Sequence, residues 1–211
     1  MTSTGSRTGG VALTLAAGGI LGLAAQCSIA TSGAQQPADP KQQMVATLSA
    51  SGPHASLGDQ AQIWDRFIGT WDCDFGFYLE DGSMRHSPGE LEFGWVLDGR
   101  AVQDLWITYP KKGERERNIG TSIRFFDDKS KSWRVVFVSP KYGAFLSVQG
   151  GVEGDRIVLR GTDDDGSALR WSFYEIQPNS FSWHGEKSRD GGKTWRLEEE
   201  HHMKRRPADR R

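Results

Sequence analysis

The sequence has few cysteines, no excess of positive charge and no cofactor motif. Of its 211 residues only Cys27 and Cys73 are cysteine, too few for a disulfide framework and without the spacing of a zinc site. The 26 lysines and arginines are balanced by 27 aspartates and glutamates, and the net charge of −1 disfavours nucleic acid as a partner. No phosphate-binding loop, dinucleotide fingerprint or Ser-His-Asp order occurs. The fold must therefore depend on its apolar core, and no motif indicates a reaction.

A hydrophobic run long enough for a membrane span is also missing. Val11–Ala25 is apolar over 15 residues, whereas a membrane-spanning helix needs about 20. This run follows a single basic residue, Arg7, and precedes small residues, which is the layout of a secretory signal. We therefore expect residues 1–30 to be a signal peptide and the protein to be exported to the periplasm or the outside of the cell. Two alternatives stay open: a lipid anchor at Cys27, and a cytoplasmic protein that starts at Met44.

Aromatic residues and glycines are plentiful. Eight tryptophans and ten phenylalanines accompany 26 glycines, a combination typical of strands and tight turns. From Trp71 onward apolar and polar residues alternate with a period of two, and Asp98-Gly99 is a strong hairpin signal. Further strands are expected at 101–109, 119–127, 133–139, 144–150, 156–161, 169–176, 181–187 and 195–203. About ten consecutive strands with no interposed helix predict an all-β fold, a single antiparallel up-and-down barrel.

The residues ahead of the strands predict a linker and a helical cap. Residues 31–55 have the composition of a linker and contain a short helix at 41–50. A second helix is expected to begin at Ser56, where Asp59 would complete a capping box. Its apolar face, which would pack against the barrel, consists of Ile63, Trp64, Phe67 and Ile68. The barrel domain with this helix would span residues 56–205, followed by a tail at 206–211.

Alternation also predicts which side chains face the barrel interior. Ile123 and Phe125 are expected inward, as is Leu197, whereas Arg124 falls on the opposite register and is expected in solvent. Seven of the eight tryptophans fall on the inward register, one in each of seven strands: Trp71, Trp95, Trp106, Trp133, Trp171, Trp183 and Trp195. The sequence therefore predicts a barrel interior lined by tryptophan.

Three segments together resemble a known family. They read FIGTWDCDFGFYLEDGS, GELEFGWVLDGRAVQDLW and GTSIRFFDDKSKSWRVVFV, and they contain a Gly-Thr-Trp first strand (69–71) and a Trp-x-Leu-x-Gly-Arg hairpin (95–100). Over about residues 54 to 205 the chain is similar to a bacterial calycin-type family, domain of unknown function 1579. The resemblance implies a calycin-like, lipocalin-like or fatty-acid-binding-like barrel with a pocket, and it does not imply a reaction.

Polar residues on the inward register are candidates for a binding site, because small-molecule sites combine apolar walls with a few polar groups. Buried charges need partners, and two pairings would supply them: Arg100 with Asp104, and His201 with Glu175. The predicted ligand-binding residues are Trp95, Arg100, Asp104, Trp106, Trp133, Trp171, Glu175, Trp183, Glu199 and His201.

The leading hypothesis is an exported barrel that binds a small, partly apolar or aromatic molecule without a cofactor. One alternative is an enzyme that uses Asp104, Glu175, Glu199 and His201 as acids and bases. Another is a filled barrel that serves as a structural or interaction module. A metal ion held by Glu199 and His201, or haem bound through His201, lacks a spacing signature. Neither the ligand nor the oligomeric state follows from the sequence.

Overall fold

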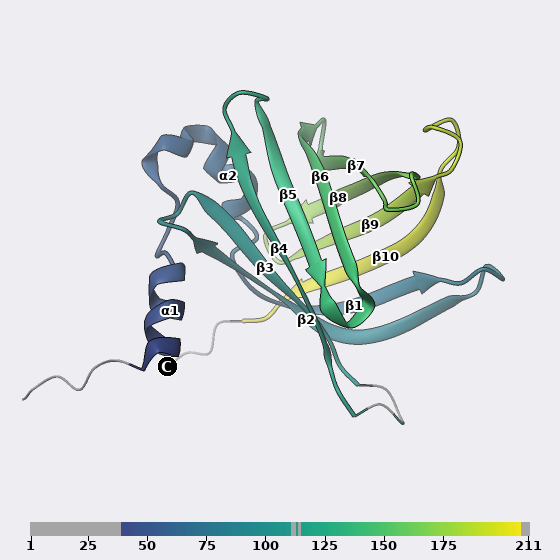
Figure 1. Ribbon diagram of the computed structural model, residues 1–211, viewed down its shortest axis with the longest axis horizontal. Coiled ribbons are helices and arrows are strands. Elements are labelled where there is room, and N and C mark those ends of the chain that lie inside the picture. The colour runs from purple at the N-terminus through teal and green to yellow at the C-terminus, as the bar shows by residue number, and fades with distance from the viewer. Residues whose placement is uncertain (1–38, 111–112, 114, 208–211) are drawn as a thin grey trace, which may run out of the picture. The chain divides into compact units, whose positions relative to one another are not determined.

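The computed structural model describes residues 39–110, 113 and 115–207, and in this part ten strands form a closed antiparallel barrel (Figure 1). Each strand pairs with its neighbours in sequence, and β1 pairs with β10 to close the sheet. The strands are β1 (Gly69–Tyr78), β2 (Met84–Val96), β3 (Ala101–Thr108), β4 (Asn118–Asp127), β5 (Ser132–Ser139), β6 (Ala144–Glu153), β7 (Arg156–Thr162), β8 (Ala168–Gln177), β9 (Ser180–Ser188) and β10 (Arg196–Arg205). The predicted up-and-down barrel is confirmed. The expected signal peptide lies outside the described residues.

The helices are short and precede the barrel, apart from one turn of 3-10 helix. They are α1 (Pro40–Leu48), η1 (Ala55–Gln60), α2 (Ala61–Asp65) and η2 (Pro140–Tyr142). The prediction of a continuous helix from Ser56 is wrong, because Gly58 lies within η1 at φ 50° and ψ −132° and interrupts the helical conformation there, three residues before α2 begins. The Ser56 amide donates to the ring of His54, which takes the N-cap position. None of the helices in the described part of the chain has the length and hydropathy that a membrane crossing requires.

The segment around α2 closes one end of the barrel. Trp64 and Phe67 are fully buried, and both rings contact Phe173 at centroid distances of 5.1 and 5.5 Å. Phe67 also meets Phe93 and Phe181, so the aromatic cluster joins α2 to strands on several sides of the barrel. In Figure 1 α2 lies at the opposite end from the tips of the β1–β2 and β9–β10 hairpins. The predicted helical cap is therefore a plug at one end only.

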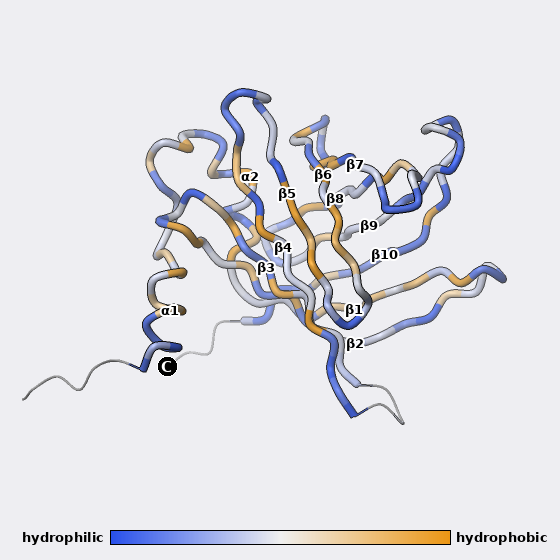
Figure 2. Tube along the Cα trace, viewed as in Figure 1, coloured by the Kyte–Doolittle hydropathy of each residue, from blue (hydrophilic) through white to orange (hydrophobic). Residues whose placement is uncertain are grey.

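The predicted inward register holds in most strands and fails in β4. Figure 2 shows apolar residues along the strands and hydrophilic residues in the hairpin turns. In β4, however, Arg124 is buried inside, while Phe125 is 46% exposed outside, which reverses the prediction. The reason is pairing: Asp104 of β3 lies opposite Ser122, and the same face of β4 then carries Arg124, which forms an ion pair with Asp104. A buried ion pair overrides the apolar alternation here.

Two bulges reverse the expected direction of other side chains. In β8 the register shifts after Tyr174, and Glu175 takes φ 51°, so Glu175 is exposed and Ile176 packs against the core instead. In β10 the register shifts between Leu197 and Glu199. Trp195 consequently lies on the outer face, where the Arg170 guanidinium sits 4.2 Å above its ring. The inward orientations expected for Glu175, Trp195 and Leu197 are therefore wrong, because a bulge inserts a residue and breaks the period of two.

Candidate binding cavity

A cavity of about 310 Å³ occupies the end of the barrel opposite the plug, and we call it the upper cavity. Its aromatic lining consists of Phe77, Trp106, Tyr109, Phe137, Tyr142, Trp171 and Trp183. Residues of β1, β3, β5, β8 and β9 thus contribute rings to one space, because inward positions on neighbouring strands of a barrel share a face. The interior is neither empty nor filled: it is packed around the plug and open at the other end.

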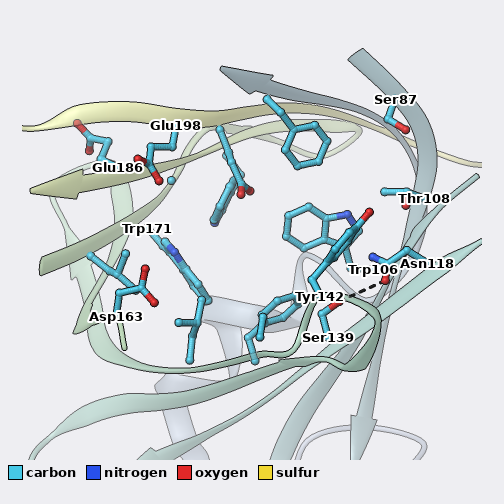
Figure 3. Close-up of a pocket in the computed structure, with 18 of the residues that line it drawn as sticks. Ser87, Trp106, Thr108, Asn118, Ser139, Tyr142, Asp163, Trp171, Glu186 and Glu198 are labelled. Carbon is cyan, nitrogen blue, oxygen red and sulfur yellow. Dashed lines mark hydrogen bonds between the residues drawn. The ribbon is translucent and has the colours of Figure 1, made fainter. Parts of the chain in front are cut away.

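Acidic and neutral polar residues lie on different sides of the upper cavity. Figure 3 shows Asp163, Glu186 and Glu198 on one side, with Trp171 and Trp106 between them and the far wall. The far wall carries neutral groups, Ser87, Thr108, Asn118 and Ser139, and the Ser139 hydroxyl donates to Asn118 Oδ1 at 3.3 Å. One wall is therefore acidic, whereas the rest of the lining presents uncharged hydrogen-bonding groups and the basic Arg85, whose guanidinium lies over the Phe77 ring.

Part of the acidic wall is compensated by basic residues. Arg170 makes two hydrogen bonds to the Glu186 carboxylate, at 2.6 and 2.7 Å, and they lower the pKa of Glu186 below its ordinary value. Lys187 contacts Asp163 at 2.6 Å. Among the described residues no basic side chain forms an ion pair with Glu198. This wall therefore keeps negative charge at Glu198.

A second, smaller space of about 50 Å³ lies between the upper cavity and the plug, and we call it the lower chamber. Four aromatic residues line both spaces: Trp106, Phe137, Trp171 and Trp183. The rest of the lower chamber is formed by Phe75, Leu91, Asp104, Ser122, Arg124, Val135, Leu159, Phe173, His201 and Met203. The shared rings make the two spaces neighbours within one interior.

His201 is held among aromatic rings in the lower chamber. Its ring stacks on Trp183 at a centroid distance of 4.7 Å and an angle of 14°, and it meets Trp106 edge-on at 4.9 Å. His201 Nε2 lies 3.2 Å from Glu199 Oε2, and Glu199 in turn lines the upper cavity. Since the carboxylate can only accept, Nε2 carries the proton of this hydrogen bond. The pair links the two spaces.

Below His201 lies the buried ion pair of Arg124 and Asp104. Asp104 Oδ1 also accepts the Ser122 backbone N–H at 3.0 Å, and Oδ2 accepts from Arg124 Nη2. The Arg124 guanidinium lies 4.3 Å from the Trp64 ring, directly against the plug. Burial lowers the pKa of Arg124, although the charge of Asp104 opposes that shift. This buried ion pair thus lies between the plug and the lower chamber.

The structure brings together part of the predicted site. Trp106, Trp171, Trp183 and Glu199 line the upper cavity, and Asp104 and His201 line the lower chamber. Trp95 and Trp133 are buried in the core instead and line neither space.

Both predicted charge pairings are wrong. Arg100 is exposed and donates to Ser56 Oγ at 3.0 Å, because Leu97–Arg100 form a turn in which strand alternation no longer applies. Its place beside Asp104 is taken by Arg124. Glu175 is turned outward by the β8 bulge, where it accepts from Ser182, so it cannot reach His201.

Sequence reasoning missed several residues of the site. Phe137 lies two residues after Val135 in β5, and this alternation of apolar residues is a usable signal for an inward ring. Asn118 and Ser139 carried no such signal, because they lie at strand ends. In the described part of the chain no group of three or more His, Cys, Asp or Glu is arranged to hold a metal ion. Of the four residues considered as acids or bases, only Glu199 and His201 are in contact.

Comparison with known proteins defines the class of fold. No family model and no curated protein sequence matches the chain. The S-type phycobiliprotein lyase CPES from Guillardia theta superposes with a TM-score of 0.50 at 11% identity, covering 70% of this chain and 92% of the lyase. Rv2717c from M. tuberculosis superposes with a TM-score of 0.52 at 15% identity, covering 73% of this chain and 99% of that protein. The chain therefore has a calycin-like fold, and at these identities the likeness extends to the fold alone.

Proposed function

We propose that the protein is an exported calycin-like barrel that binds a small, partly apolar or aromatic molecule in the upper cavity. One observation carries the proposal: a cavity of about 310 Å³, open at one end, has walls built from Trp106, Trp171 and Trp183. A volume of this order is within the range of roughly 300–1,000 Å³ found for small-molecule sites. Membership of domain of unknown function 1579 is part of the same proposal.

The chemistry of the walls narrows the ligand class. Aromatic rings offer flat faces for an apolar or aromatic body, and Ser87, Thr108 and Asn118 offer hydrogen bonds to a polar substituent. Because Arg85 and Glu198 both line the cavity, charge of both signs is present and a ligand without net charge suits the lining best.

Ligand binding can be tested by tryptophan fluorescence and native mass spectrometry, with 4-phenylbutan-1-ol and n-butylbenzene as probes. We expect saturable quenching and a 1:1 complex with the wild-type chain. Trp171→Ala should weaken binding at least about tenfold, because buried aromatic contacts dominate binding energy. Trp195→Ala is the matched control, since Trp195 lies outside both spaces, and it should leave the affinity unchanged. Equal loss in both variants, or no complex with either probe, would contradict the proposal.

Export is the second part of the proposal and has its own test. The full-length chain would be expressed in a Gram-negative host, fractionated, and its mature N-terminus sequenced. We expect the protein in the periplasmic fraction with an N-terminus after residue 30. A lipid-modified Cys27 would show anchoring instead, and a cytoplasmic product that begins at Met44 would show that the expectation of export is wrong.

A further inference from the structure

The lower chamber holds polar atoms that have no partner within the described part of the chain. They are Arg124 Nε and Nη1, Trp106 Nε1 and His201 Nδ1, and each is buried. All three residues line the lower chamber, and Arg124 and His201 are only 2% exposed. Buried polar groups are almost always hydrogen-bonded, so a convergence of this kind indicates a binding partner from outside the fold.

An unpartnered indole alone does not define a site. Trp64 Nε1 and Trp133 Nε1 also have no partner among the described residues, yet neither residue lines the upper cavity or the lower chamber. The lower chamber differs because three such residues surround one space. Its volume of about 50 Å³ exceeds the roughly 10–15 Å³ that a water molecule needs, so a small polar group fits.

The charges of the lower chamber define which polar group fits. Arg124 is neutralised by Asp104, so the chamber has no free positive charge to balance an anion. His201 Nε2 is engaged with Glu199, so Nδ1 is the free nitrogen of the ring, and it is an acceptor in the tautomer whose proton is on Nε2. The chamber therefore presents donors from Arg124 and Trp106 and an acceptor from His201, and its Arg124 charge is balanced by Asp104. A group that both accepts and donates, and is itself uncharged, matches this set.

We infer that the lower chamber binds an uncharged hydroxyl group at the end of the ligand whose apolar body lies in the upper cavity. This inference rests on the proposed function, because it assigns the orientation of the ligand in the same site. The four rings shared by the two spaces would surround the connecting part of the ligand. The hydroxyl oxygen accepts from Trp106 and Arg124 and donates its proton to His201 Nδ1.

Three probes of one shape test this assignment: 4-phenylbutan-1-ol, n-butylbenzene and 4-phenylbutanoate. We expect the wild-type chain to bind the alcohol about 5- to 10-fold more tightly than the hydrocarbon, the size of one or two net hydrogen bonds. We expect the carboxylate to bind more weakly than the alcohol. Dissociation constants would be measured by calorimetry, with native mass spectrometry to confirm stoichiometry.

Variants assign the preference to the lower chamber. Trp106→Phe keeps the ring and removes the indole donor, so it should lower the preference for the alcohol by about half or more. The double variant Asp104→Leu/Arg124→Met removes the guanidinium donors without leaving a lone charge. It should remove the part of the preference for the alcohol that Arg124 supplies. Trp171→Phe is the matched control: it should weaken both probes alike and leave their ratio unchanged.

The outcomes separate this inference from the proposed function. Equal binding of alcohol and hydrocarbon, or a preference that Trp106→Phe leaves intact, overturns the hydroxyl assignment while the barrel still binds ligands. Tightest binding of the carboxylate overturns the choice of an uncharged group. Binding of none of the three probes overturns the proposed function, and the assignment with it.

Discussion

At the scale of single residues, the stability of the barrel interior depends on keeping Arg124 paired. Arg124 and Asp104 have side chains only 2% and 8% exposed, and their ion pair rests on the Trp64 ring. Removing one partner of such a pair leaves an uncompensated buried charge. We predict that Asp104→Leu lowers the free energy of unfolding by about 3–5 kcal/mol. The double variant Asp104→Leu/Arg124→Met should recover most of this loss, as measured by urea unfolding.

The control for this prediction is an exposed ion pair. Glu153 and Arg160 form one on the barrel surface, where both side chains are 49% exposed. Glu153→Gln should change the free energy of unfolding by less than about 1 kcal/mol, because water screens such pairs. If Asp104→Leu costs no more than Glu153→Gln, the buried pair does not carry the energy assigned to it.

A second residue-scale prediction concerns pH. Burial lowers the pKa of His184 below its ordinary value of 6.5, opposed by Glu186 and Glu200, while Arg156 and Arg170 lower it further. The unfolded chain therefore binds this proton at a higher pH than the folded barrel does. Stability should be fully present above about pH 6.5 and decline as the pH falls toward the folded-state pKa of His184.

The variant His184→Gln should remove this part of the pH dependence. We expect its free energy of unfolding to decline less between pH 7 and pH 5 than that of the wild-type chain. His86→Gln, which removes a histidine whose side chain is 55% exposed, serves as the control. The same decline in both variants would show that His184 does not contribute.

At the scale of elements, alternation predicts strands well and fails where pairing or a bulge overrides it. The inward faces of β1, β5, β7 and β9 follow directly from apolar residues at every second position. β4 fails because Ile123 and Phe125 suggest an inward face that the ion pair of Arg124 occupies instead. No single-strand pattern reveals that Arg124 has a partner on β3. Alternation within a strand predicts the tryptophans of the cavity. It places Arg124 on the outer face, because the partner that holds Arg124 inside lies on another strand.

The β8 bulge gives an element-scale prediction. Glu175 has φ 51°, a left-handed conformation that glycine adopts freely and β-branched residues resist. We predict that Glu175→Val lowers the free energy of unfolding by about 1–3 kcal/mol relative to Glu175→Gly. Urea unfolding of the two variants checks this directly. Equal stabilities would mean that the chain does not pass through a left-handed residue at this position.

At the scale of the whole molecule, the barrel has one closed and one open end, so a ligand must enter through the mouth of the upper cavity. The plug of Trp64 and Phe67 is fully buried, whereas Ala144 lies in the lining of the mouth. Side chains along β6 alternate between the two faces of the barrel wall: Ala144 faces the cavity, while Ser147 is exposed on the outer surface. A bulky side chain can therefore be placed on either face of the same strand.

We predict that Ala144→Trp weakens binding of 4-phenylbutan-1-ol by at least about tenfold, because the indole takes space at the mouth that the ligand needs. Its free energy of unfolding should change by less than about 1 kcal/mol, since the side chain enters an open space and displaces no core residue. Ser147→Trp adds the same side chain to the outer face and should leave the affinity unchanged. Calorimetry and urea unfolding of both variants decide the matter. Unimpaired binding in Ala144→Trp would mean that ligands reach the interior by another route, and equal impairment in Ser147→Trp would mean that the loss does not arise at the mouth.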